Sequence, residues 1–169
     1  NEAKPEASDE RCAEAYTTIF ERVGIGAITF KTFASGGIFS KYSHEFQALS
    51  DAGEDTIYLS REKNIAVNEE VYTDEVLSDL GLDRAALEKK TSIEVGNIFK
   101  LGTRFSEALG LFYADQSGRA KPVVMGSYGI GPTRLMGTIV EALCDDRGIV
   151  WPKSVAPFRA HLLSLGEDR

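Results

Sequence analysis

The stretch VVMGSYGIGPTRL, from Val123 to Leu135, indicates how the second half of the chain folds. An apolar run precedes Gly126 and a helical pattern follows Gly131, which predicts a strand that turns directly into a helix. Glycines let a flat ligand approach the backbone closely. Arg134, in the first helical turn, can stack on a ring or grip a phosphate with its planar fork. The alternative is close strand–helix packing beside a surface arginine.

The glycine spacing in this stretch is G-x-x-G-x-G-x-x-R. It is not the dinucleotide-binding fingerprint G-x-G-x-x-G, because Arg134 stands where the third glycine belongs. It is not a phosphate loop either, since Gly-Lys-Ser/Thr is absent from it. The spacing therefore indicates contact with an anion or a flat ring, but it matches neither of these common nucleotide-binding motifs.

Composition indicates a globular domain. The chain has 169 residues, of which 43% are hydrophobic and 27% are charged, values that are ordinary for one domain with a real core. Its net charge of -7 argues against a generic binder of phosphate backbones. The net charge does not exclude contact with nucleic acid through a local basic patch. Cys12 and Cys144 lack metal-ligand spacing, which favours a reduced, cytoplasmic setting. No apolar run approaches the ~20 residues of a membrane span.

The first third of the chain predicts one helix and several strands. After a disordered lead-in over residues 1–8, Ser8 is expected to cap a helix that runs to Val23 and stops at Gly24. Alternating apolar patterns then predict strands over residues 27–34, 44–50 and 54–60.

The pattern changes over residues 61–90, where the sequence predicts a solvated connector of short acidic helices. Thr73 is expected to start a helix that Gly81 ends, and Asp83 to start another.

The remaining elements include strands at residues 92–102 and 158–165, a hairpin around residues 116–118 and a helix over residues 131–145. Antiparallel strands with a flanking helix and few β-α-β alternations predict an α+β fold.

Glu94 is the carboxylate of an otherwise apolar segment, IEVGNIF. Regular alternation places Ile93, Val95 and Asn97 on one face of the strand and Glu94 with Gly96 on the other. A buried carboxylate is costly without a partner or a cation, so Glu94 is a candidate ligand for Mg²⁺ or a ribose hydroxyl. The alternative is a glutamate that points outward into solvent.

His44 stands between Ser43 and Glu45 in a predicted strand, after a glycine-containing loop. A Ser–His–Glu hydrolase triad does not fit, because neighbours on a strand point to opposite faces. His44 is therefore expected in a pocket wall or in the core, and His161 is expected to be structural.

Four blocks, in this order along the chain, resemble the bacterial prolyl-tRNA synthetases. They are SHEFQALSDAGEDTI (43–57), IEVGNIFKLGTRFSEAL (93–109), VMGSYGIGPTRL (124–135) and RGIVWPKSVAPF (147–158). The resemblance runs from about Tyr16 to Leu165, with an interruption over residues 61–90. It implies a class II synthetase core, an antiparallel sheet with flanking helices. It also implies proline, ATP, Mg²⁺ and tRNA(Pro) as ligands of a cytoplasmic enzyme that is a homodimer at full length.

The resemblance also implies roles for single residues. Arg134 matches the catalytic arginine that contacts ATP in the family's third motif. The residues expected to contact ATP are Glu94, Asn97, Gly129, Gly131 and Arg134, with Glu94 also expected to hold Mg²⁺. Those expected around proline are Phe99, Ser127, Gly126 and His44. Ser127 stands where many bacterial members have cysteine, which puts fine amino-acid discrimination in doubt.

In domain terms, residues 1–155 are expected to be the C-terminal portion of the catalytic core, and residues 156–169 the start of the anticodon-binding domain. The family's first two motifs would precede Asn1, so the chain alone is expected to be inactive. The connector, residues 61–91, has only about thirty residues, too few for the editing domain of many bacterial members. Two alternatives stay open: a non-catalytic synthetase-like binding or regulatory module, and a ligase for another small amino acid.

Overall fold

A six-stranded sheet organises the protein, whose computed structural model describes residues 5–166. Its strand order is β2-β1-β4-β3-β5-β8, and β2 also pairs with β5. The helices are α1 (Pro5–Arg22), α2 (Asp74–Leu80), α3 (Arg104–Ala108) and α4 (Pro132–Leu143). The sheet strands are β1 (Thr29–Ser35), β2 (Tyr42–Leu49), β3 (Asp55–Ser60), β4 (Ile65–Asn68), β5 (Glu88–Gly102) and β8 (Met125–Gly129). Two small hairpins are formed by β6 (Phe112–Ala114) with β7 (Ala120–Pro122), and by β9 (Cys144–Asp145) with β10 (Gly148–Ile149).

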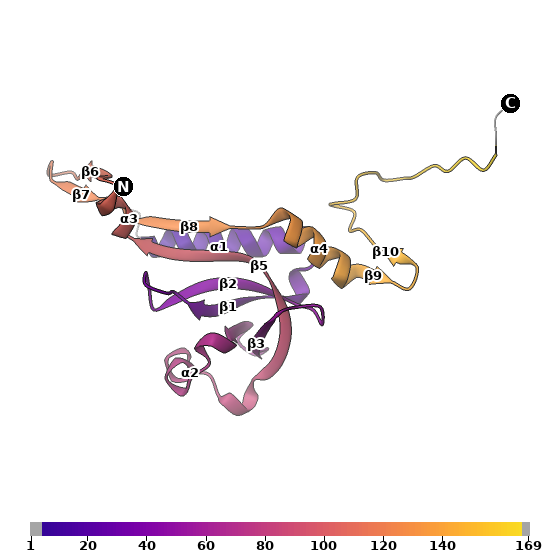
Figure 1. Cartoon of the computed structure of the whole chain (residues 1–169), viewed down its shortest axis with the longest axis horizontal. Coiled ribbons are helices and arrows are strands. Elements are labelled where there is room, and N and C mark those ends of the chain that lie inside the picture. Colours follow the sequence, from indigo (N-terminus) through magenta and orange to yellow (C-terminus); the bar gives the residue numbers. More distant parts are fainter. Residues whose placement is uncertain (1–4, 167–169) are drawn as a thin grey trace.

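The long strand β5 joins the parts of the sheet (Figure 1). It has 15 residues, of which the first pair with β3, the middle ones with β2 and the last with β8. Because β1 pairs with both β2 and β4, and β3 with both β4 and β5, the strands β1 to β5 close into a ring. All of these pairings are antiparallel except β1 with β4. The mostly antiparallel sheet with flanking helices confirms the predicted α+β class.

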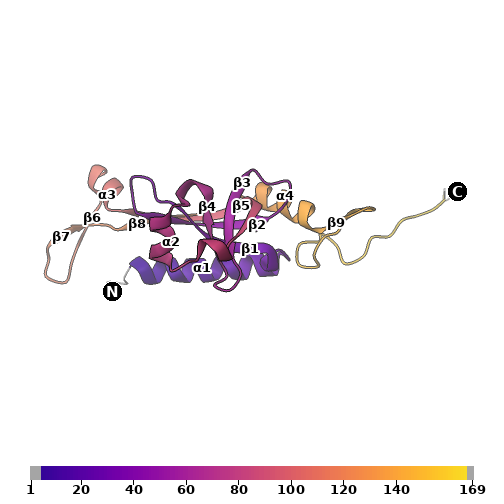
Figure 2. The same ribbon diagram turned by 90° about the horizontal axis from the view of Figure 1, so that it is seen from below.

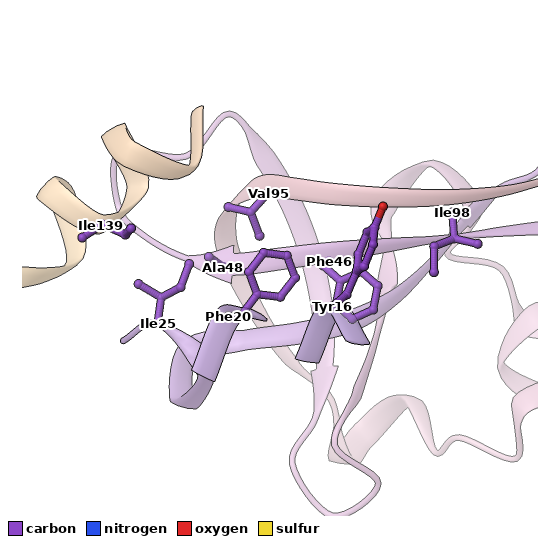
Figure 3. Packing of buried hydrophobic residues seen from close by; sticks show 8 residues of the cluster. All are labelled: Tyr16, Phe20, Ile25, Phe46, Ala48, Val95, Ile98 and Ile139. Atoms are coloured by element: carbon purple, nitrogen blue, oxygen red, sulfur yellow. The ribbon is translucent and has the colours of Figure 1, made fainter. Parts of the chain in front are cut away.

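Helix α1 lies along one face of the sheet, as Figures 1 and 2 show from two directions. Its Tyr16 and Phe20 contact Phe46 of β2, with ring centroids 5.2 and 5.4 Å apart respectively. Figure 3 shows this core with its other members, Ile25, Ala48, Val95, Ile98 and Ile139. Burial of each large apolar side chain stabilises the fold by about 1.5–3 kcal/mol. We call this covered side, marked by Phe46 and Ala48 of β2, the helix face.

The connector folds as part of the ring. Val67 of β4 packs against Val76 and Leu77 of α2 in a small core of its own. The helix begins and ends as predicted: the Thr73 hydroxyl oxygen accepts a hydrogen bond from Val76 N at 3.3 Å, and Gly81 adopts the left-handed conformation at φ 61°. The prediction of a merely solvated connector is wrong, because its strand β4 pairs with β1 and β3.

Three local predictions are also wrong. Helix α1 begins at Pro5, so Ser8 is not its cap, and the described residues 5–8 are helical; residues 1–4 of the predicted lead-in lie outside the described part. Asp83 caps only a short 3-10 turn before β5 starts at Glu88, because pairing with β3 overrides helix propensity there. Residues 158–165 form no strand within the described part, where no other strand lies alongside them, and they trail away from the sheet (Figure 1).

The predicted hairpin and last helix are confirmed as β6–β7, with Gly118 at φ 80°, and as α4. Among the described helices, none is both long enough and apolar enough to cross a membrane.

Candidate active site

A β-bulge in β5 shapes the candidate site. Phe46 of β2 lies opposite Gly96, whereas the next residue, Gln47, lies opposite Glu94, so Val95 is the extra residue of the bulge. The bulge reverses the alternation of side chains beyond it. Gly96 consequently turns to the helix face, where an added Cβ would lie only 3.1 Å from Cε2 of Tyr16.

The bulge brings Glu94 and Asn97 together on the sheet face opposite α1, which we call the site face. Asn97 donates a hydrogen bond from Nδ2 to Glu94 Oε1 at 2.9 Å. The prediction that Asn97 shares a face with Val95 and opposes Glu94 is therefore wrong, because it assumed an unbroken strand. A carboxylate and an amide held side by side suit the binding of hydroxyl groups or a cation.

Strand β8 adds further predicted residues to the site face. Asn97 lies opposite Gly129, and Phe99 lies opposite Ser127. Directly opposed residues on paired strands share a face, so Phe99, Ser127 and Gly129 add three positions to the face that carries the Glu94–Asn97 pair. An added Cβ at Gly129 would lie 3.2 Å from Oδ1 of Asn97, so glycine at this position leaves room for the amide.

Two predicted pocket residues lie on the helix face instead. An added Cβ at Gly126 would lie 2.5 Å from the hydroxyl oxygen of Tyr128, and that hydroxyl donates to Asp9 Oδ1 of α1 at 2.7 Å. His44 precedes Phe46 by two residues on β2, and its ring centroid lies 5.1 Å from that of Phe33. The structure thus separates Gly126 and His44 from the face that carries Glu94 and Asn97, and their place around proline stays a prediction.

The surroundings of His44 keep it neutral. Burial lowers the pKa of His44 to about 4, and the positive charges of Lys31 and Lys100 act in the same direction. Burial also lowers the pKa of Lys31. Asp9 partly balances this positive charge, with Oδ2 lying 3.8 Å from Nζ of Lys100.

Arg134 lies in the first turn of α4, which Gly131 precedes as the N-cap and which Pro132 opens. Its Nη2 donates to Glu54 Oε1 at 3.3 Å, and the side chains are 49% and 75% exposed respectively. An ion pair this exposed contributes about 0–1 kcal/mol. Glu54 therefore restrains the guanidinium only weakly, and an anionic ligand can compete for it.

Sequence reasoning missed a polar network beside the Glu94–Asn97 pair. Gln47 is completely buried, and its Nε2 donates to Glu45 Oε2 at 2.9 Å and to Asp55 Oδ2 at 2.8 Å. Asn68 of β4 also donates to Glu45 Oε2, at 3.1 Å. The only signal in the sequence was the two-residue spacing of Glu45 and Gln47, since nothing local pointed to Asp55 or Asn68.

Burial raises the pKa of Glu45, and the nearby carboxylate of Glu94 acts in the same direction. The hydrogen bonds from Gln47 and Asn68 oppose this rise. Within the described residues, no group of three or more His, Cys, Asp or Glu side chains is arranged to hold a metal ion. Magnesium is commonly bound by one or two carboxylates together with substrate phosphates, so the single carboxylate of Glu94 fits that mode.

Comparisons with known proteins show the family of the chain. Residues 2–143 match the family model of the tRNA synthetase class II core domain (G, H, P, S and T). The chain is 36% identical over 165 residues to a proline–tRNA ligase of Rickettsia akari, which covers 90% of this chain and 38% of that protein. It is 56% identical over 88 residues to the proline–tRNA ligase of Levilactobacillus brevis, which covers 52% of this chain and 16% of that protein.

A solved structure shares the fold. The crystal structure of prolyl-tRNA synthetase from Cryptosporidium parvum, complexed with L-proline and AMP, superposes with a TM-score of 0.50 at 16% identity. The match covers 88% of this chain and 25% of that one. The chain thus spans well under half the length of the relatives it matches.

Proposed function

Because the chain belongs to the family of class II tRNA synthetase core domains, we propose that it is the C-terminal part of the catalytic core of a proline–tRNA ligase. The parent protein activates proline with ATP to give prolyl-adenylate and pyrophosphate, and then transfers the prolyl group to tRNA(Pro). The observation that carries the proposal is the Glu94–Asn97 pair on the site face, with Gly129 opposite Asn97. The proline–tRNA ligases among its relatives support the choice of amino acid.

The proposed chemistry is attack by the proline carboxylate on the α-phosphate of ATP, which forms the mixed anhydride and releases pyrophosphate. Glu94 and Asn97 would hold ATP, and Gly129 and Gly131 let it approach the sheet. Arg134 supplies a fixed positive charge at the start of α4, where negative charge on the nucleotide is stabilised. Mg²⁺, which Glu94 would hold, neutralises phosphate charge when it is bound.

Phe99 and Ser127 face one another across β5 and β8, and we assign them to one wall of the proline pocket. A ring and a small hydroxyl suit a compact amino acid with an apolar ring. The rest of the proposal concerns the parent protein. Residues 1–155 belong to its catalytic core and residues 156–169 to the start of its anticodon-binding domain. It works in the cytoplasm as a homodimer.

The experiment is ATP–pyrophosphate exchange by the purified full-length protein, with proline, alanine and serine compared at equal concentration. We expect exchange that depends on proline. Exchange with alanine or serine in place of proline would make it a ligase for another small amino acid. No exchange with any amino acid by a folded protein would favour a non-catalytic module.

A further inference from the structure

Gln47 lies where the β-bulge forms. The register between β2 and β5 shifts between Phe46 and Gln47, and this shift is what turns Glu94 and Asn97 to the same face. Gln47 is completely buried and lies directly opposite Glu94. The conformation of the Gln47 side chain therefore affects the β5 backbone that holds Glu94 and Asn97 on the site face.

Every polar atom of the Gln47 amide is engaged. Nε2 donates to Glu45 and Asp55, at 2.9 and 2.8 Å, while Oε1 accepts from Ser92 Oγ at 2.9 Å. Ser92 is itself completely buried and belongs to β5, two residues before Glu94. These bonds tie β2, β3 and β5 together beside the bulge, with one rotamer of the amide satisfying all of them.

The connector adds a hydrogen bond to the network around Gln47. Asn68, the last residue of β4, donates from Nδ2 to Glu45 Oε2 at 3.1 Å, and Glu45 lies opposite Asn97. The Oδ1 of Asn68 separately accepts from the backbone N–H of Glu70 at 3.1 Å. One amide thus binds the Glu45 carboxylate and also caps the following turn.

We infer that the connector, residues 61–91, is a functional part of the candidate active site, because its Asn68 orients Glu45 and Gln47 and thereby fixes the bulge that presents Glu94 and Asn97. Asn68, Glu45 and Gln47 are positioning residues, since they act through the pair rather than on a ligand. The inference rests on the proposed function, and it assigns the connector a role in ATP binding that its length alone does not indicate.

The central variant is Asn68→Asp in the full-length protein. It keeps an oxygen that caps Glu70 but replaces the amide donor with a carboxylate that faces Glu45. We expect the KM for ATP in pyrophosphate exchange, and the Kd for ATP by calorimetry, to rise roughly ten-fold, as for other residues that orient a binding group. The matched control is Asn64→Asp, the same substitution at an exposed site of the same connector, which is expected to leave both constants unchanged.

The reciprocal double variant tests the contact itself. With Glu45→Gln added to Asn68→Asp, the new amide can donate to the new carboxylate, so part of the ATP affinity is expected to return. If Asn68→Asp does not fold, Asn68→Ser keeps a capping oxygen without adding charge and is expected to raise the KM for ATP by a smaller factor.

Two results would overturn the inference: a lower melting temperature with unchanged ATP constants, or a double variant that binds ATP no better than Asn68→Asp. The wild-type protein is measured first and tests the proposed function separately. Without proline-dependent exchange by the wild type, the proposed function fails and the inference fails with it.

Discussion

Asn97 Nδ2 lies 2.9 Å from Glu94 Oε1, although the two residues are three positions apart on one strand. On an unbroken strand an odd separation sends side chains to opposite faces. The extra residue Val95 shifts the alternation of side chains by one position, so the Glu94 carboxylate and the Asn97 amide lie side by side on the site face.

Arg134→Ala in the full-length protein is expected to impair activation mainly through ATP. Loss of a charge-assisted contact worth about 1.5–3 kcal/mol corresponds to roughly ten- to a hundred-fold in kcat/KM for ATP. Lysine is expected to rescue activity only in part, because it keeps the charge but lacks the planar fork. The measurement is pyrophosphate exchange at varied ATP, paired with a melting curve.

Glu54→Gln is the control for Arg134, because it removes the partner of the exposed ion pair and leaves the guanidinium in place. It is expected to preserve ATP kinetics. Wild-type ATP kinetics in a folded Arg134→Ala enzyme would contradict the nucleotide role of this arginine.

Gly96→Ala is expected to destabilise this chain by about 1–3 kcal/mol, as overpacking of a core does. The new Cβ would lie 3.1 Å from Tyr16 Cε2 and 3.2 Å from the backbone oxygen of Gly129. The control is Gly137→Ala in α4, where an added Cβ meets nothing within 4 Å and helix propensity favours alanine by about 1 kcal/mol. Urea unfolding followed by the fluorescence of Trp151, the one tryptophan, compares them; equal stability of the two variants would refute the described bulge.

Acidification is expected to destabilise the folded chain through His44. Its folded pKa of about 4 lies below the ordinary 6.5, so between these values the unfolded state takes up a proton that the folded state does not. The free energy of unfolding therefore falls as pH drops from about 6.5 towards 4. Lys31, Lys100 and Asp9 are the charged groups that act on this imidazole.

Urea unfolding across this pH range, for the wild type and His44→Gln, measures the effect. Glu45 contributes a slope of the opposite sign, because burial raises its folded pKa, and the difference between the two proteins isolates His44. Identical pH profiles for the two proteins would show that His44 is not buried in its neutral form.

The 169-residue chain alone is expected to show no proline-dependent pyrophosphate exchange. The chain covers 38% of the Rickettsia akari relative, and the resemblance implies that the arginine on the α-phosphate belongs to the family's second motif, which none of the four matching blocks contains. Loss of one such electrostatic contact costs roughly 10²–10³ in rate. Measurable exchange by the folded chain would show that its own residues suffice for activation.

The parent protein is expected to correct mischarged alanine poorly in cis. The connector, residues 61–91, is folded into β4, α2 and the start of β5 and is part of the strand ring, rather than a domain of its own. The assay is deacylation of alanyl-tRNA(Pro) by the full-length protein, with prolyl-tRNA(Pro) as the control substrate. Rapid and selective hydrolysis of the alanyl ester would contradict this prediction.

Local sequence alone was enough to predict the strand–helix junction, the α2 caps and the fold class. A cap such as Thr73 or Gly81 acts within one turn of chain, and apolar periodicity reports on one element at a time, so neither needs the rest of the fold. The tertiary structure decided which faces these elements present. Glu94 meets Asn97 only because β2 pairs with β5 across a bulge, and Asn68 reaches Glu45 only because the connector closes the ring. Both contacts depend on the pairing of segments distant in sequence, which no local pattern records.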